Sequence, residues 1–212
     1  MSSRSTPGAA STQPATEADD APITPVGVDV GTKQLVAVAT VDADLSDAVV
    51  VDGERARRTY SAFQEATHRL HERDMSETLG DVVWRHWRRL RRELQAAAEA
   101  VLAVAQRHAR PVVVLEDLPG HPQPLVAARE GGIRAPTWLP PVIQSVVADR
   151  VVEAGVPVTY VDPKYTTQQC HACGLLASVE DDTIVCSTED CPVGEVCRDR
   201  SAAVSIAKRV LD

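Results

Sequence analysis

The stretch ITPVGVDVGTKQLVAVATVD, residues 23–42, decides which fold the rest of the chain must complete. Valines alternate with other residues in its first half, a Gly-Thr turn follows, and LVAVATV supplies a second run of strand-forming residues. DAVVVDG, residues 47–53, has the composition of a third strand. The stretch therefore predicts a meander of three strands.

Helices and strands then alternate along the chain. Residues 54–80 are polar and we expect them to be irregular, whereas a helical period runs from Val83 to about His108. Its apolar positions are Trp84, Trp87, Leu90, Leu94, Ala98, Val101, Leu102 and Ala105. PVVVLEDL (111–118) predicts a buried parallel strand, WLPPVIQSVVADRVVEAG (138–155) a second helix, VPVTYVDP (156–163) a fifth strand, and residues 199–211 a last helix.

Three strands followed by helix–strand crossovers predict an α/β fold with a mixed sheet covered by helices, the ribonuclease-H-like plan. We expect a disordered tail at 1–22, which is rich in Ser, Thr, Ala and Pro, and a Pro- and Gly-rich loop at 119–136. The core then spans 23–163, a cysteine-bearing insertion spans 164–198, and 199–212 returns to the core.

Composition limits the function classes. A net charge of −8 argues against a uniformly basic surface for nucleic acid but allows a local basic groove. No apolar run approaches the roughly 18 residues of a membrane span, and the N-terminus has no secretory apolar segment. We therefore expect a cytoplasmic protein.

Three carboxylates fall at the ends of predicted elements. Asp29 lies in the first strand, Glu116 ends the fourth strand, and Asp199 opens the last helix. The first and fourth strands are neighbours in this plan, so the acids can share a pair of Mg²⁺ ions for phosphodiester cleavage. The alternatives are a solvated acid at a strand end and, for Asp199, a helix cap. Asp-x-Gly-Thr also opens sugar kinases and ATPases, but no second motif of that kind is present.

All five cysteines lie between residues 170 and 197, which favours metal over disulfides. Cys170 and Cys173 form one pair, and Cys186 and Cys191 form a wider second pair, the layout of a zinc ribbon. Cys197 is left as a spare thiol.

A basic stripe marks the first long helix at three- and four-residue spacing, formed by Arg85, Arg88, Arg89 and Arg92. Such a stripe can hold a phosphate backbone. It can equally be a solvated helix face.

Four segments resemble, in order, the nuclease segments and zinc ribbon of TnpB-type (OrfB) transposon-encoded proteins, relatives of the compact RNA-guided CRISPR nucleases. They are VGVDVGTKQLVAVAT, VVVLEDL, VPVTYVDPKYTTQQCHACG and DRSAAVSIAKRV. The resemblance implies a RuvC-like nuclease core with Asp29, Glu116 and Asp199 as catalytic Mg²⁺ or Mn²⁺ ligands. It also implies structural zinc on Cys170, Cys173, Cys186 and Cys191, with DNA and a guide RNA as partners.

The sequence departs from the family in three ways. Ser201 replaces the asparagine of the family's Asp-x-Asn-Ala-Ala motif, the second cysteine pair is stretched, and the first nuclease strand lies close to the start of the chain. Family members carry a long N-terminal half that grips guide RNA and target DNA. Two functions follow, a metal-dependent DNA endonuclease or a truncated, non-cleaving nucleic-acid-binding protein. A zinc-ribbon interaction module is a third.

Overall fold

The computed structural model describes residues 21–73, 76–118 and 139–211. The elements of the core are β1 (Thr24–Val30), β2 (Gln34–Thr40), the short 3-10 helix η1 (Leu45–Asp47), β3 (Val49–Asp52), α1 (Glu54–Glu72), α2 (Ser76–Ala105), β4 (Pro111–Glu116), α4 (Pro140–Glu153), β5 (Val158–Val161) and α5 (Arg198–Lys208). Three further strands, β6 (Ser178–Glu180), β7 (Thr183–Val185) and β8 (Glu195–Cys197), precede α5. The tail predicted at 1–22, except its last two residues, and the loop predicted at 119–136 lie outside the described residues.

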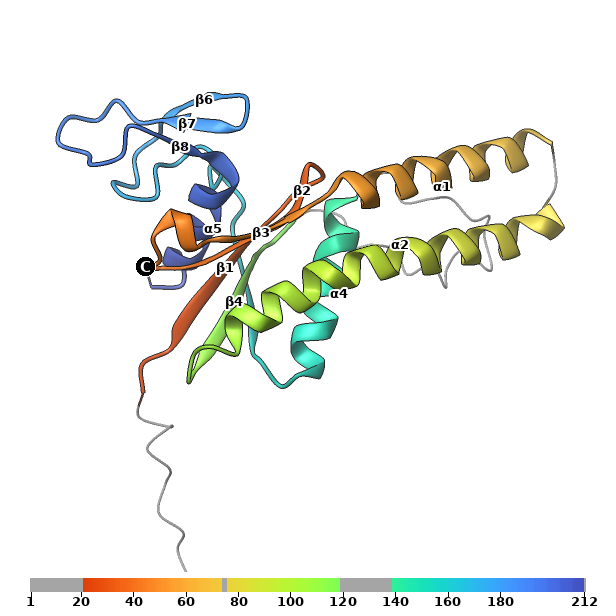
Figure 1. Cartoon of the computed structure of the whole chain (residues 1–212), viewed down its shortest axis with the longest axis horizontal. Coiled ribbons are helices and arrows are strands. Elements are labelled where there is room, and N and C mark those ends of the chain that lie inside the picture. The colour runs from red at the N-terminus through yellow and green to blue at the C-terminus, as the bar shows by residue number, and fades with distance from the viewer. Residues whose placement is uncertain (1–20, 74–75, 119–138, 212) are drawn as a thin grey trace, which may run out of the picture.

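A five-stranded mixed sheet in the order β3-β2-β1-β4-β5 forms the centre of the molecule (Figure 1). β1, β2 and β3 pair antiparallel, while β1 pairs with β4 and β4 with β5 in parallel. The α/β class, the meander and the adjacency of the first and fourth strands are confirmed. This order and these directions are the ribonuclease-H-like plan.

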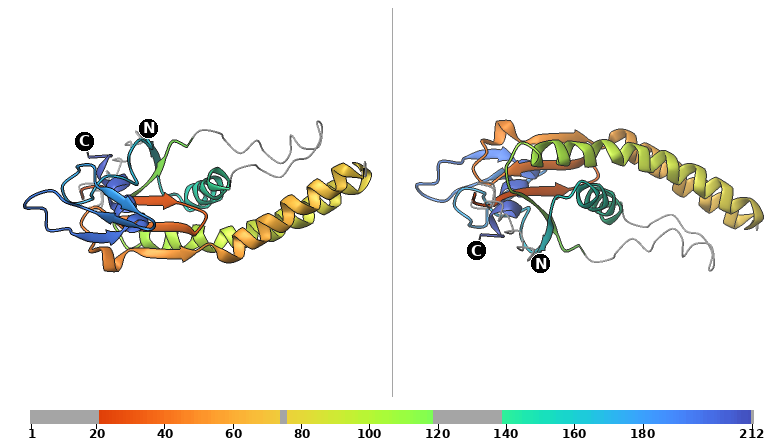
Figure 2. Two further views of the ribbon diagram at one scale, coloured as in Figure 1. Left: turned by 90° about the horizontal axis from the view of Figure 1, so that it is seen from above. Right: turned by 90° about the horizontal axis from the view of Figure 1, so that it is seen from below.

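The helices cover the two faces of the sheet unequally. The main core joins one face to α2 and α4 through apolar side chains such as Val26, Leu94 and Ile143. α5 packs on the opposite face against β1 and β2, where small residues such as Ala37 and Ala203 meet (Figures 1 and 2). α1 and α2 form a long hairpin that extends beyond the sheet.

Two expectations about this hairpin were wrong. Residues 54–72 are helical rather than irregular, because one face of α1 still supplies a buried stripe at helical spacing. That stripe consists of Ala56, Thr59, Tyr60, Phe63 and Thr67. Trp84 does not face the core but is 54% exposed, because Val83, Trp87 and Leu90 already fill the buried side of α2.

Glycine at position 27 lets α5 approach β1 closely. A Cβ placed there would lie 2.0 Å from the carbonyl oxygen of Ala203 and 2.5 Å from the amide nitrogen of Ala207. No side chain fits between this strand and this helix. The contact therefore fixes how far the first turn of α5, with Asp199, stands from β1.

The insertion is a small antiparallel sheet in the order β6-β7-β8. β8 runs directly into α5, so the chain returns to the core within one residue. The sequence predicted an insertion here but none of these three strands. None of the helices in the described part of the chain is long and apolar enough to cross a membrane.

Candidate metal centres

Asp29 and Glu116 come together through the register of two parallel strands. Gly27 of β1 pairs with Val114 of β4, and each acid stands two residues further along its strand. Side chains two residues apart point to the same face of a sheet. Because Gly27 faces α5, Asp29 does too, and Glu116 lies beside it on that face.

Asp199 reaches the same face from the first turn of α5. The residue that caps this helix is Cys197, so Asp199 is not the cap. Asp29, Glu116 and Asp199 are only 6%, 6% and 7% exposed. Three acids predicted from separate parts of the sequence thus occupy one buried region, which we call the carboxylate site.

Burial and mutual repulsion disfavour negative charge in the carboxylate site. Burial raises the pKa of Asp29 well above its ordinary value, and the charges of Asp199 and Glu116 raise it further. Burial also raises the pKa of Glu116, although a hydrogen bond from Thr166 opposes that change. Buried carboxylates that repel one another stay ionised only beside a cation and otherwise take up a proton, and hard divalent ions prefer oxygen ligands. The three acids therefore offer the kind of donor that Mg²⁺ or Mn²⁺ takes, although their oxygens do not all lie within 4.8 Å of one another.

Residues that sequence reasoning overlooked hold Glu116 in place. The hydroxyl of Thr166 donates a hydrogen bond to its carboxylate, and the side-chain amide of Gln144 donates to its backbone carbonyl. Thr166 is itself 1% exposed. The available signal was a threonine four residues before the first cysteine pair, but only the fold reveals that it meets Glu116, fifty residues earlier.

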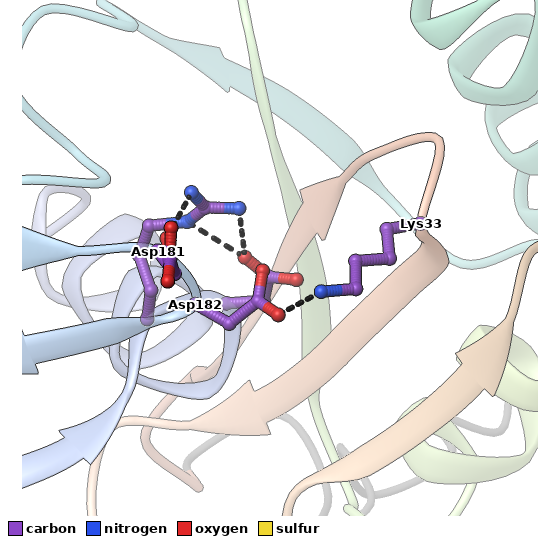
Figure 3. Close-up of polar contacts among 5 residues, drawn as sticks. Lys33, Asp181 and Asp182 are labelled. Atoms are coloured by element: carbon purple, nitrogen blue, oxygen red, sulfur yellow. Dashed lines mark hydrogen bonds and ion pairs between the residues drawn. The ribbon is translucent and has the colours of Figure 1, made fainter.

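Arg198 brings a positive charge into contact with the carboxylate site. Its Nε and Nη2 each lie 3.0 Å from Oδ1 of Asp199, and its Nη1 donates to the backbone carbonyl of Asp181 at 2.9 Å. Asp181 lies in the turn between β6 and β7. Figure 3 shows this turn, in which Asp182 forms an ion pair with Lys33 of the β1–β2 turn. Nothing in the sequence alone indicated a role for Arg198.

Four cysteines form a second, separate cluster. The Sγ atoms of Cys170, Cys173, Cys186 and Cys191 all lie within 4.8 Å of one another. Zinc bound tetrahedrally to thiolates at about 2.3 Å sets sulfur–sulfur separations of about 3.8 Å. The separations are 3.8 Å between Cys170 and Cys191 and 3.7 Å between Cys173 and Cys186. The cluster can hold a zinc ion.

Cys197 and His171, the histidine between Cys170 and Cys173 in the sequence, are not part of this cluster. Cys197 ends β8 and is not among the clustered cysteines. Nδ1 of His171 instead lies 3.1 Å from the hydroxyl of Ser201 in α5. Ser201 occupies the position of the family's asparagine, so the departure noted in the sequence lies where the cysteine segment contacts the core.

The arginine stripe lies on α2, the helix that covers the face of the sheet opposite the carboxylate site. Arg85, Arg88, Arg89 and Arg92 are all exposed. The structure adds Arg91, which lines a shallow hollow together with Arg85, Arg88, Arg92 and Gln95. Arg55 of α1 and Glu93 form an ion pair at 3.1 Å along the other edge of the stripe.

Comparison with known proteins identifies relatives of one part of the chain. Residues 143–206 match the family model described as Cas12f1-like, TNB domain. No curated protein matches the sequence significantly. The matched segment runs from α4 through the cysteine cluster into α5 and includes Asp199.

Solved structures share the fold over most of the chain. A Cas12f1–sgRNA–target DNA complex matches with a TM-score of 0.59 at 15% identity, covering 87% of this chain and 49% of that one. A CRISPR-Cas12f ternary complex gives 0.57 at 14% identity, with 87% and 38% covered. The mini-RNA-guided endonuclease CRISPR-Cas_phi3 gives 0.51 at 13% identity, with 91% and 45% covered. The chain thus spans about half or less of these proteins, and the resemblance found in the sequence is confirmed.

Proposed function

We propose that this chain is the RuvC-like nuclease core of a TnpB-type protein and cleaves DNA with divalent metal ions. The convergence of Asp29, Glu116 and Asp199 on one buried face of the sheet is the observation that carries this proposal. In the proposed domain arrangement, residues 23–163 and 199–212 form the core, and 164–198 form a zinc ribbon on Cys170, Cys173, Cys186 and Cys191. A cytoplasmic location, with access to the DNA, belongs to the same proposal.

Each acid reaches the proposed metal site from a different element. Asp29 and Glu116 supply carboxylate oxygens from adjacent strands, and Asp199 supplies one from across the site. Divalent ions held by these three acids would supply the charge that activates water and stabilises the leaving oxygen of a phosphodiester. Thr166 keeps Glu116 oriented, and the close packing of α5 on Gly27 keeps Asp199 near Asp29.

A cleavage assay tests the proposal. Purified protein is incubated with labelled single- and double-stranded DNA in Mg²⁺ or Mn²⁺. We expect cleavage of the DNA, and Asp29→Ala should abolish it. Glu153→Ala, which replaces an exposed acid on α4, should leave cleavage unchanged. DNA binding without cleavage, with or without RNA that purifies with the protein, would instead support the second candidate, a non-cleaving nucleic-acid-binding protein.

The arginine stripe is the proposed contact for the nucleic-acid backbone. Arg88 and Trp84 lie four residues apart on one flank of α2, which sets an exposed aromatic ring beside a guanidinium. Bases of a single strand stack on such rings while arginines hold the phosphates. The replacement of Arg88 and Arg92 by Gln should reduce the slope of log K against log salt for single-stranded DNA by about 1.4. Arg107→Gln, outside the stripe, should not change it.

Guide RNA and target DNA enter this proposal through the relatives. The Cas12f1 structure is a complex with sgRNA and target DNA. By analogy, RNA base pairing selects the DNA and this chain performs the cut. Isolation of the native protein and sequencing of any bound RNA would test that part separately from cleavage.

A further inference from the structure

The side chain of Arg198 contacts both Asp199 of the carboxylate site and the β6–β7 turn of the cysteine-bearing insertion. Its guanidinium touches Asp199 through Nε and Nη2 and the turn between β6 and β7 through Nη1. Its backbone amide also donates to the carbonyl of Asp182 at 2.8 Å. Arg198 is therefore fixed at three points.

The β6–β7 turn that holds Arg198 is itself anchored. Asp182 forms an ion pair with Lys33 in the β1–β2 turn of the core (Figure 3). Asp181 has a φ of 50°, a left-handed conformation that directs its carbonyl without help from its side chain. The turn thus lies between two parts of the core and presents a backbone acceptor to the guanidinium.

The position of Asp199 does not depend on Arg198. Asp199 is buried in the first turn of α5, and α5 is seated by Gly27 and by the small residues of the sheet. Arg198 is more exposed, with 31% of its side chain accessible. Loss of the guanidinium would remove a positive charge without moving the carboxylate.

We propose that Arg198 is a counter-ion built into the carboxylate site, held there by the β6–β7 turn, and that it competes with divalent ions for Asp199. Its charge also lowers the pKa of Asp29, which burial raises well above the ordinary value. A fixed monovalent cation lets three acids lie together when divalent ions are scarce, and it lowers the affinity of the site for those ions. Arg198 thus tunes metal binding through its charge and not by placing the ligands, and this inference rests on the proposed metal-dependent function.

Manganese binding to the zinc-loaded protein tests the inference without any measurement of cleavage. Free Mn²⁺ is followed by electron paramagnetic resonance during titration. Arg198→Met should bind Mn²⁺ about fivefold more tightly, or better, than the unsubstituted protein. Arg198→Lys, which keeps the charge, should lie closer to the unsubstituted protein. Asp181→Gly keeps the backbone acceptor and the left-handed turn and should have no effect.

The outcomes separate the two proposals. Suppose that the unsubstituted protein binds Mn²⁺ and that Asp29→Asn abolishes this binding. If Arg198→Met then binds Mn²⁺ more weakly or equally well, Arg198 is not a competing counter-ion, and the proposed function stands. An absence of Mn²⁺ binding in both proteins overturns both. A merely structural role predicts weaker binding, because a loosened site loses affinity.

Discussion

Gly27→Ala is expected to separate α5 from β1 and so to test the arrangement that builds the carboxylate site. The added Cβ would lie 2.0 Å from the carbonyl oxygen of Ala203, whereas real Cβ atoms essentially never come within 3.0 Å of another atom. The obstacle is helix backbone, so α5 as a whole must retreat by about 1 Å. Overpacking of this kind costs about 1–3 kcal/mol and occasionally more. We expect the upper end, about 3 kcal/mol.

Urea unfolding of the two proteins measures this loss. Gly80→Ala is the matched control, because nothing lies within 4 Å of a Cβ at that position of α2. The same chemical change there should raise the unfolding free energy by about 0.5–1 kcal/mol, since alanine favours the helix. A loss below about 1 kcal/mol for Gly27→Ala would refute the close packing and the position it gives Asp199.

Three further predictions follow from the two metal centres. Cys191→Ser should lower the zinc content measured by plasma mass spectrometry, while Cys197→Ser should not; equal loss in both would contradict the four-cysteine site. Thr166→Val should reduce the unfolding free energy by about 1.5–3 kcal/mol, because the buried Glu116 carboxylate loses its donor. Thr166→Ser keeps the hydroxyl and should lose less, and an equal loss would argue against that bond. Without Mg²⁺ or Mn²⁺, Asp29→Asn should stabilise the fold, and its advantage should grow as pH rises. A raised pKa in the folded state means that ionisation of Asp29 costs stability as pH rises through that pKa, so an advantage largest at acid pH would contradict the burial of this charge.

The sheet could be predicted because its signals are local. Alternating valines and the apolar run before Glu116 indicate strands, and the order of elements then limits the topology. α1 could not be recognised as readily, because Thr59 and Thr67 take positions on its buried face that apolar residues usually fill. The hydroxyl of Thr67 donates a hydrogen bond shared between the backbone carbonyls of Phe63 and Gln64, and this bond makes the burial of Thr67 possible.

The acids and cysteines could be named from the sequence because their chemical types and spacing are informative. Arg198 and Thr166 could not, because each acts through a partner that only the fold brings near: the turn at Asp181 for one and Glu116 for the other. Trp84 shows the opposite limit. Its apolar character suggested the core, yet helical phase places it on the flank beside Arg88.

Anomalous diffraction from crystals soaked in Mn²⁺ would show directly whether the carboxylate site binds metal. We expect manganese peaks coordinated by carboxylate oxygens of Asp29, Glu116 and Asp199 on the α5 face of the sheet. If crystals soaked in saturating Mn²⁺ show no peak among these three acids, or show peaks only elsewhere on the chain, the proposed metal site is wrong.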